Sequence, residues 1–168
     1  MTLIIRPEHP ADHAAIRAVT QRAFAPMAYA GGNEQHLIDR FREAGALALS
    51  LVAERDGVVR GQATFTKAFA ADGSAGWYAL GPIAVEPDLQ KQQIGSQLIE
   101  AGIADLRARD AAGCVLVGDP AYYRRFGFKP FPDLCPDGEP AEYFRILPLR
   151  VKAPQAVVSF HPLFQGAA

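Results

Sequence analysis

The stretch from residue 82 to residue 96 constrains the fold more than any other part of the chain. It reads Pro-Ile-Ala-Val-Glu-Pro-Asp-Leu-Gln-Lys-Gln-Gln-Ile-Gly-Ser: an apolar strand ending in Val85, a short polar turn, and a helix that opens around Gln93. The first N–H groups of a helix have no intrahelical partner, and the helix dipole adds positive charge there. The unit therefore predicts an anion site suited to a phosphate-bearing ligand.

The composition indicates one globular domain, with 168 residues of which 49% are apolar and 21% charged. The 17 basic and 18 acidic residues give a net charge of −1, so we expect neither nucleic acid nor a membrane surface as a partner. The N-terminus does not have the pattern of a signal peptide. The two cysteines and four histidines show no metal-ligand spacing, so we expect no metal, no disulfide and a cytoplasmic location.

The apolar patterning predicts a mixed α/β sheet that is mostly antiparallel, with a single strand-helix-strand crossover, rather than a doubly wound sheet. We expect a single domain over residues 1–152 and a loose C-terminal tail over residues 153–168. The expected strands are Thr2–Arg6, Leu47–Ala53, Gln62–Thr66, Trp77–Val85, Cys114–Gly118 and Phe144–Val151, and the expected helices begin at Pro10, after Asn33, around Gln93 and at Pro120.

Two segments together resemble the GCN5-related N-acetyltransferase (GNAT) superfamily. The turn Gln90–Gly95 resembles the Gln-x-x-Gly-x-Gly/Ala loop of these proteins, and Tyr123–Phe128 resembles their Tyr-x-x-x-Gly-Phe signature. Leu80–Val85 and Tyr122–Phe128 are also similar to segments of a bacterial subfamily of predicted N-acetyltransferases. The resemblance spans roughly residues 3–150. It implies the GNAT fold, in which the sheet splays between its fourth and fifth strands and is flanked by helices.

The resemblance further implies that acetyl-CoA is the cosubstrate and lies in this splay. Its pantetheine arm would pair with the backbone at the end of the fourth strand, and its pyrophosphate would sit on the N–H groups of residues 92–96. Gln93 departs from the family pattern, which has glycine there. We expect a first-turn helical conformation without positive φ at Gln93, and a modest loss of CoA affinity. The implied cofactor-binding residues are Ile83, Ala84, Val85, Gln90, Lys91, Gln92, Gln93, Ile94, Gly95 and Ser96.

Tyr123 occupies the position at which many family members carry a general acid. A phenol at the mouth of the splay would protonate the departing CoA thiolate. The alternative is that Tyr123 is an aromatic packing residue. The adjacent Tyr122 is expected to face the core or the wall of an acceptor pocket, and Asp119 to cap the short helix.

The general base is left open by the sequence. Glu34 opens the second expected helix, next to a loop that usually lines the acceptor pocket in this family, but a first-turn glutamate is also a common partner of the helix dipole. Glu86 follows the fourth expected strand and would act through water or simply be solvated.

The implied reaction moves an acetyl group, by direct attack, to a primary amine of a small molecule or to a protein N-terminus or lysine. The alternative is a sensor or interaction module that binds acyl-CoA without transferase activity. Acceptor choice is expected to lie in residues 25–33 and 130–142. The aromatic residues Tyr29, Phe131 and Tyr143 would frame a small amine. The sequence leaves open whether the protein forms a homodimer.

Overall fold

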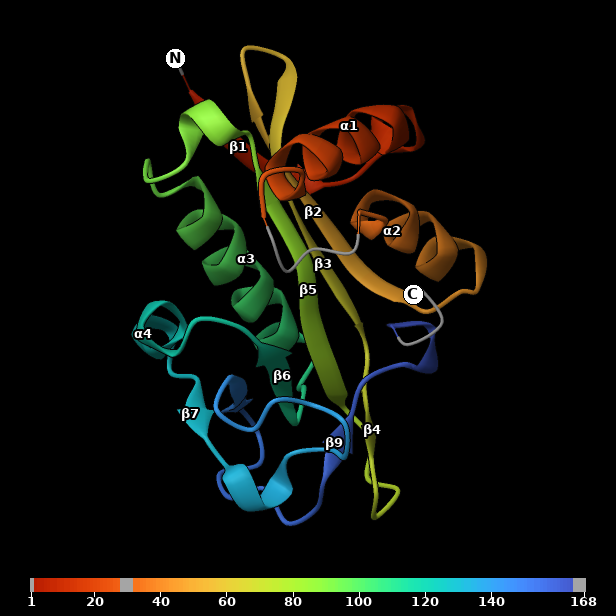
Figure 1. The fold of residues 1–168 in the computed structure, drawn as a ribbon, viewed down its shortest axis with the longest axis vertical. Helices are drawn as coiled ribbons and strands as arrows, with labels where there is room; N and C mark the ends of the chain where they lie inside the picture. Colours follow the sequence, from red (N-terminus) through yellow and green to blue (C-terminus); the bar gives the residue numbers. More distant parts are fainter. Residues whose placement is uncertain (1, 28–31, 165–168) are drawn as a thin grey trace.

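The computed structural model describes residues 2–27 and 32–164, which form an open sheet between two layers of helices (Figure 1). The seven-stranded sheet has the order β1-β2-β3-β5-β6-β8-β7, and only the β5–β6 pair is parallel. Its strands are β1 (Leu3–Pro7), β2 (Leu47–Arg55), β3 (Val58–Lys67), β5 (Trp77–Val85), β6 (Gly113–Val117), β7 (Lys129–Pro130) and β8 (Phe144–Pro148). The mixed, mostly antiparallel sheet predicted from the sequence is confirmed.

The helices divide between the two faces of the sheet. Figure 1 shows α1 (His13–Phe24) and α2 (Glu34–Glu43) on one side, and α3 (Ile94–Ala108) and α4 (Pro120–Tyr123) on the other. Side chains alternate accordingly along the strands, because successive residues of a strand point to opposite faces. On β2, Leu51 joins the core under α3, whereas Val52 joins the core under α1.

Helix α3 lies close against the sheet. Its apolar stripe, including Ile94, Leu98 and Leu106, is fully buried. Gly102 faces the ring of Phe65 on β3, and a methyl group at Gly102 would collide with that ring. The contact fixes the height of α3 above the central strands, and so the position of the N-terminus of α3 beside the end of β5.

The C-terminal segment is not the loose tail that the sequence predicts, at least as far as Phe164. Strand β9 (Val158–Ser159) pairs antiparallel with β4 (Phe69–Ala70) in a small second sheet. Further on, the ring of Phe164 lies 4.8 Å from that of Phe41 on α2, measured between centroids. These partners are distant in the sequence and no local pattern indicates them. The last strand of the main sheet also ends earlier than expected, at Pro148 rather than Val151.

No helix of the described part of the chain is both long enough and apolar enough to span a bilayer.

Candidate functional site

The sheet opens between β5 and β6. Their parallel pairing runs from Trp77 opposite Gly113 to Ala79 opposite Val115 and then stops. Strand β5 continues to Val85 with its other edge paired to β3, where Ile83, Ala84 and Val85 oppose Ala63, Gln62 and Gly61. The backbone edge of residues 83–85 that faces β6 therefore has no strand partner among the described residues. This is the splay, and it brings together the first three predicted site residues.

A β-bulge lies at the mouth of the splay. Leu80 opposes Phe65 and Ile83 opposes Ala63, so Gly81 and Pro82 together face the single residue Thr64. A bulge bends its strand and increases the local twist, and bulges are frequent next to active sites. This one turns the end of β5 away from β6 where the pairing has already stopped.

The turn after β5 delivers the start of α3 to the same place. The Nε2 atom of Gln90 donates a hydrogen bond to the carbonyl oxygen of Val85 at 3.2 Å, which ties the turn to the strand end. The first intrahelical bond of α3 runs from the N–H of Gln97 to the carbonyl of Gln93. The N–H groups of Ile94, Gly95 and Ser96 precede it and so have no acceptor within the helix. They are available to an anion.

The expectation that Gln93 needs no positive φ is wrong. Gln93 lies just outside α3, at φ 65° and ψ 14°, in the left-handed region, and Lys91 also has a positive φ of 68°. A non-glycine residue in this conformation costs about 1–2 kcal/mol, and glycine avoids that cost. The glycine of the family pattern therefore has a conformational reason.

Tyr122 and Arg125 also contact the start of α3. Tyr122 packs against the core cluster under α3, in keeping with the core position expected for it. The Tyr122 hydroxyl lies 3.4 Å from the Ser96 hydroxyl and borders Gly95. Arg125 donates to the Ser96 hydroxyl at 3.3 Å, and its guanidinium lies 5.2 Å from the centre of the Tyr122 ring. Adjacent tyrosines on a one-turn helix carry no sequence signal that says which of them reaches a neighbouring helix.

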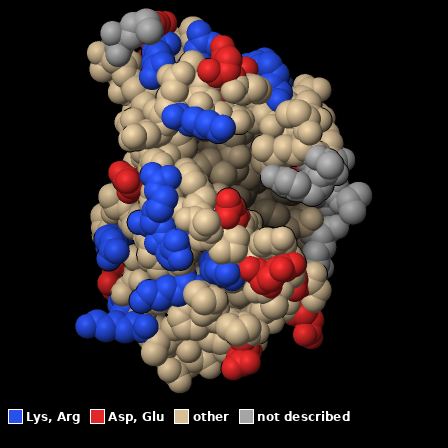
Figure 2. All heavy atoms as spheres, turned by 60° about the vertical axis from the view of Figure 1, so that its left-hand side comes forward, with Lys and Arg blue, Asp and Glu red and all other residues tan. Residues whose placement is uncertain are grey.

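Positive charge gathers on this side of the molecule although the net charge is −1. Figure 2 shows Lys and Arg side chains collected along the face that comes forward from the α3 and α4 side, beside a hollow in the surface. The exposed cations of the turn, of α4 and of the segment that follows α4 are Lys91, Arg124, Arg125 and Lys129.

Tyr123 lies at the β6 side of the splay. Its ring packs so closely over Gly118, the residue after β6, that a side chain at Gly118 would collide with it. The ring also makes an edge contact with Phe128, at 5.8 Å between centroids. Asp119 caps α4 as predicted, with its side chain accepting a hydrogen bond from the N–H of Ala121 at 3.0 Å. Packing and capping together hold Tyr123 beside the end of β6.

The two acidic candidates have hydrogen-bond partners of their own. Glu34 is in the first turn of α2, on the opposite face of the sheet from α4, and accepts a hydrogen bond from the N–H of Gly32 at 3.1 Å. Glu86 is buried rather than solvated, and its two carboxylate oxygens accept hydrogen bonds from Arg22 at 2.6 and 2.8 Å. That ion pair lowers the pKa of Glu86 against the opposing effect of burial. A carboxylate held in this way is a poor proton acceptor at neutral pH.

Neither cysteine is an activated nucleophile. Complete burial raises the pKa of the Cys114 thiol far above its ordinary range. The pKa of Cys135 is also raised, first by burial and then by nearby carboxylates. Among the described residues, no group of three or more His, Cys, Asp or Glu side chains could hold a metal ion. Of the residues expected to frame the acceptor, Tyr29 lies outside the described residues, Phe131 packs against a core cluster, and Tyr143 is 45% exposed.

The ion pair between Arg22 and Glu86 predicts a pH-dependent contribution to stability. Because the pKa of Glu86 is lower in the folded state, the stabilisation is complete above its unfolded pKa of about 4.3 and is lost as the pH falls through the folded value. Arg22→Met should therefore cost about 1 kcal/mol or less at pH 7, since Arg22 is half-exposed. The difference from the parent should shrink below about pH 4. Urea unfolding between pH 3 and pH 8 measures it.

Arg107→Met is the matched control, because Arg107 is exposed on α3 and pairs with no carboxylate of the described residues. A loss for Arg22→Met that stays the same down to pH 3 would contradict the assigned ion pair.

The comparisons with known proteins agree with this geometry. Residues 47–130 match the family model described as an acetyltransferase (GNAT) domain. The chain is 35% identical over 128 residues to the uncharacterized N-acetyltransferase YhbS of Escherichia coli K12, an alignment that covers 76% of this chain and 74% of that one.

Two solved structures extend the likeness over nearly the whole chain. A GNAT family acetyltransferase from Brucella melitensis, in complex with acetyl-CoA, is 44% identical with a TM-score of 0.86, and the match covers 97% of this chain and 98% of that one. YhbS from Escherichia coli, in complex with CoA, is 29% identical with a TM-score of 0.87, over 97% and 92% of the two chains. Sequence, fold and splay together show that this chain belongs to the GNAT family of acetyltransferases.

Proposed function

We propose that this acetyltransferase takes its acetyl group from acetyl-CoA and transfers it to a primary amine, either of a small molecule or of a protein N-terminus or lysine. The observation that carries the proposal is the open β5–β6 edge next to the unpaired first turn of α3. The open strand edge can pair with an extended arm, and the first turn of α3 can bind an anion. Acetyl-CoA has both a pantetheine arm and a pyrophosphate. The complexes of the Brucella melitensis and Escherichia coli relatives with acetyl-CoA and CoA support it.

In this proposal the pantetheine arm runs along the free backbone edge of Ile83, Ala84 and Val85. Backbone pairing leaves the side chains of Ile83 and Val85 free to pack on the core, as they do. The pyrophosphate accepts hydrogen bonds from the N–H groups of residues 92–96, and Lys91 adds positive charge. Gln90 contributes indirectly, because its hydrogen bond to the carbonyl of Val85 keeps the loop against the strand end.

The chemistry is a direct attack. The nitrogen of the amine attacks the thioester carbonyl carbon, the oxyanion is held by backbone N–H groups of β5, and the C–S bond then breaks. The CoA thiolate takes a proton from the Tyr123 hydroxyl, and the amine nitrogen gives up a proton to a base. The sequence leaves this base open; Glu34 is kept as a candidate, whereas the ion pair with Arg22 disfavours Glu86. No acetyl-cysteine intermediate is needed, and the raised thiol pKa values of Cys114 and Cys135 disfavour one.

Both cysteines are free, which is in keeping with a reducing compartment, and we include a cytoplasmic location in the proposal.

Replacing Tyr123 tests the proposed acid. Tyr123→Phe keeps the ring over Gly118 but removes the proton, so kcat should fall by about 100-fold or more while the Kd for acetyl-CoA stays close to the parent value. Release of free CoA thiol, measured with a panel of primary amines, gives the rate. Tyr78→Phe, at a tyrosine in the paired part of β5 whose ring lies under Arg109, is the control and should retain the parent rate.

The outcomes separate the candidate functions. An unchanged rate in Tyr123→Phe would exclude the acid role while leaving acetyl transfer intact. Tight acetyl-CoA binding without thiol release on any amine would instead support the alternative, an acyl-CoA sensor.

Gln93 provides a separate test of the loop. Gln93→Gly removes the side chain beside the proposed pyrophosphate position, so the Kd for acetyl-CoA should fall by about threefold. Relief of the conformational cost at φ 65° acts on the free and the bound protein alike and should appear as a higher melting temperature. Gln92→Gly is the matched control, since Gln92 is equally exposed and does not have a positive φ. Calorimetry gives both constants. If Gln93→Gly binds acetyl-CoA as the parent does, Gln93 has no influence on affinity.

A further inference from the structure

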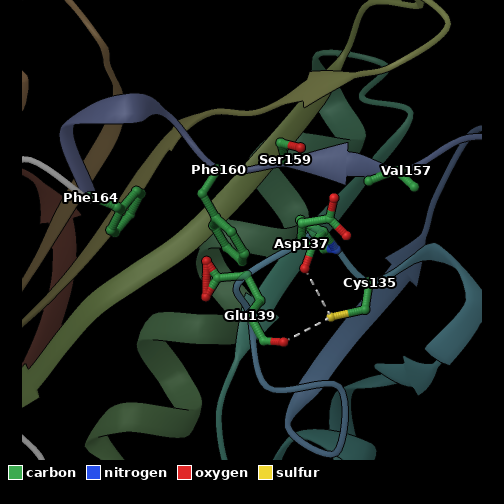
Figure 3. A pocket seen from close by; sticks show the side chains of 8 residues that line it. Cys135, Asp137, Glu139, Val157, Ser159, Phe160 and Phe164 are labelled. Carbon is green, nitrogen blue, oxygen red and sulfur yellow. Dashed lines mark hydrogen bonds between the residues drawn. The ribbon is translucent and has the colours of Figure 1, made fainter.

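A second cavity lies away from the splay loop. It encloses about 390 Å³ between the segment that follows β7 and the C-terminal segment around β9 (Figure 3). The lining residues that matter for its chemistry are Cys135, Asp137, Glu139, Ser159, Phe160 and Phe164. No residue of the proposed acetyl-CoA site lines it.

The cavity is nevertheless close to the point where the sheet opens. The ring of Phe160 contacts that of Phe144 on β8, with 6.2 Å between centroids. Phe144 is the register partner of Val117, which lies two residues beyond Val115, the last residue of β6 that pairs with β5. Phe144 and Val115 belong to the same buried cluster, which is separate from the cluster under α3. The cavity thus adjoins the splay on the face opposite α3.

The cavity carries negative charge without a counterion. Asp137 and Glu139 both line it, and no Lys, Arg or His of the described residues forms an ion pair with either. Burial raises the pKa of Glu139. The charges of both carboxylates also reach Cys135, whose pKa they raise in addition to the effect of burial. Such a half-buried carboxylate gains most from a cation that enters beside it.

Aromatic rings complete the wall. Phe160 and Phe164 lie 5.6 Å apart between centroids at an angle of 73°. In Figure 3 the Glu139 side chain points to the side of the cavity where these two rings lie. Ring faces beside a carboxylate favour an organic ammonium over a small hydrated metal ion, because they attract the charge and also bury the attached alkyl chain.

We propose that this cavity binds an alkylammonium group of the acceptor, so that the preferred acceptors are small diamines, with one amine held beside Glu139 and Phe160 and the other reaching the splay. The inference rests on the proposed acetyl transfer and names its substrate class. The held amine stays protonated, while the reacting amine is neutral when it attacks. The C-terminal segment, through Phe160 and Phe164, is then part of the acceptor site.

Calorimetry with 1,5-diaminopentane, on the full chain saturated with CoA, tests the inference without requiring turnover. The parent protein should bind 1,5-diaminopentane more tightly than pentylamine, which has one amine fewer. Glu139→Gln should raise the Kd for the diamine by about tenfold or more, and the Kd for pentylamine should rise as well, because its single ammonium would lie beside the same carboxylate. Glu142→Gln, at an exposed carboxylate of the same segment that does not line the cavity, is the matched control.

Diamine binding that is absent in the parent, or that is the same in Glu139→Gln and in the parent, overturns the inference. Absence of thiol release with every amine would overturn the proposed transfer instead, and calorimetry would still decide whether the cavity binds a diamine.

Discussion

The proposed acetyl-CoA site depends on the point at which β5 and β6 stop pairing. After Ala79 and Val115 the two strands separate, and β5 continues alone to Val85. Unpaired strand edges are normally avoided or covered, because they leave backbone donors and acceptors without partners. Here the edge lies inside the sheet, between strands, where a ligand rather than another chain is positioned to use it.

Both walls of this opening are held by packing. On the β5 side, α3 is seated by the contact of Gly102 with Phe65, and its first residue, Ile94, is buried in the same core. On the β6 side, Tyr123 packs over Gly118 and against Phe128. The loop that leads into α3 has left-handed backbone at Lys91 and Gln93, which costs conformational free energy at both residues. A preformed site of this kind avoids the entropic cost of ordering when its ligand binds.

Much of the fold could be predicted because the signals are local. The Asp56-Gly57 turn has the positive φ values that its sequence favours, and Asp119 caps α4. What escaped prediction depends on partners far along the chain. Glu86 is buried because Arg22, 64 positions earlier, reaches it. The conformation of Gln93 follows from the path between a strand end and a seated helix, and glutamine itself carries no signal for it.

The same distinction applies to the candidate sites. The loop residues follow one another in sequence, so one motif indicates them all. The cavity combines residues near Cys135 with Phe160 and Phe164, and no spacing in the sequence connects these positions. These residues come together only in the folded chain. In the two proposals, acetyl-CoA lies in the splay beside α3 and the acceptor amine would reach the acetyl carbonyl from the opposite face of the sheet.

The most direct test of the account is hydrogen exchange of the backbone amides of residues 80–85, measured by mass spectrometry with and without acetyl-CoA. If the pantetheine arm pairs with the open edge of β5, exchange in this segment slows on binding, as it does in residues 92–96. Strand β3, which is already paired on both sides, should not change. Exchange in residues 80–85 that stays the same when acetyl-CoA is bound would contradict the claim that the splay holds the cosubstrate.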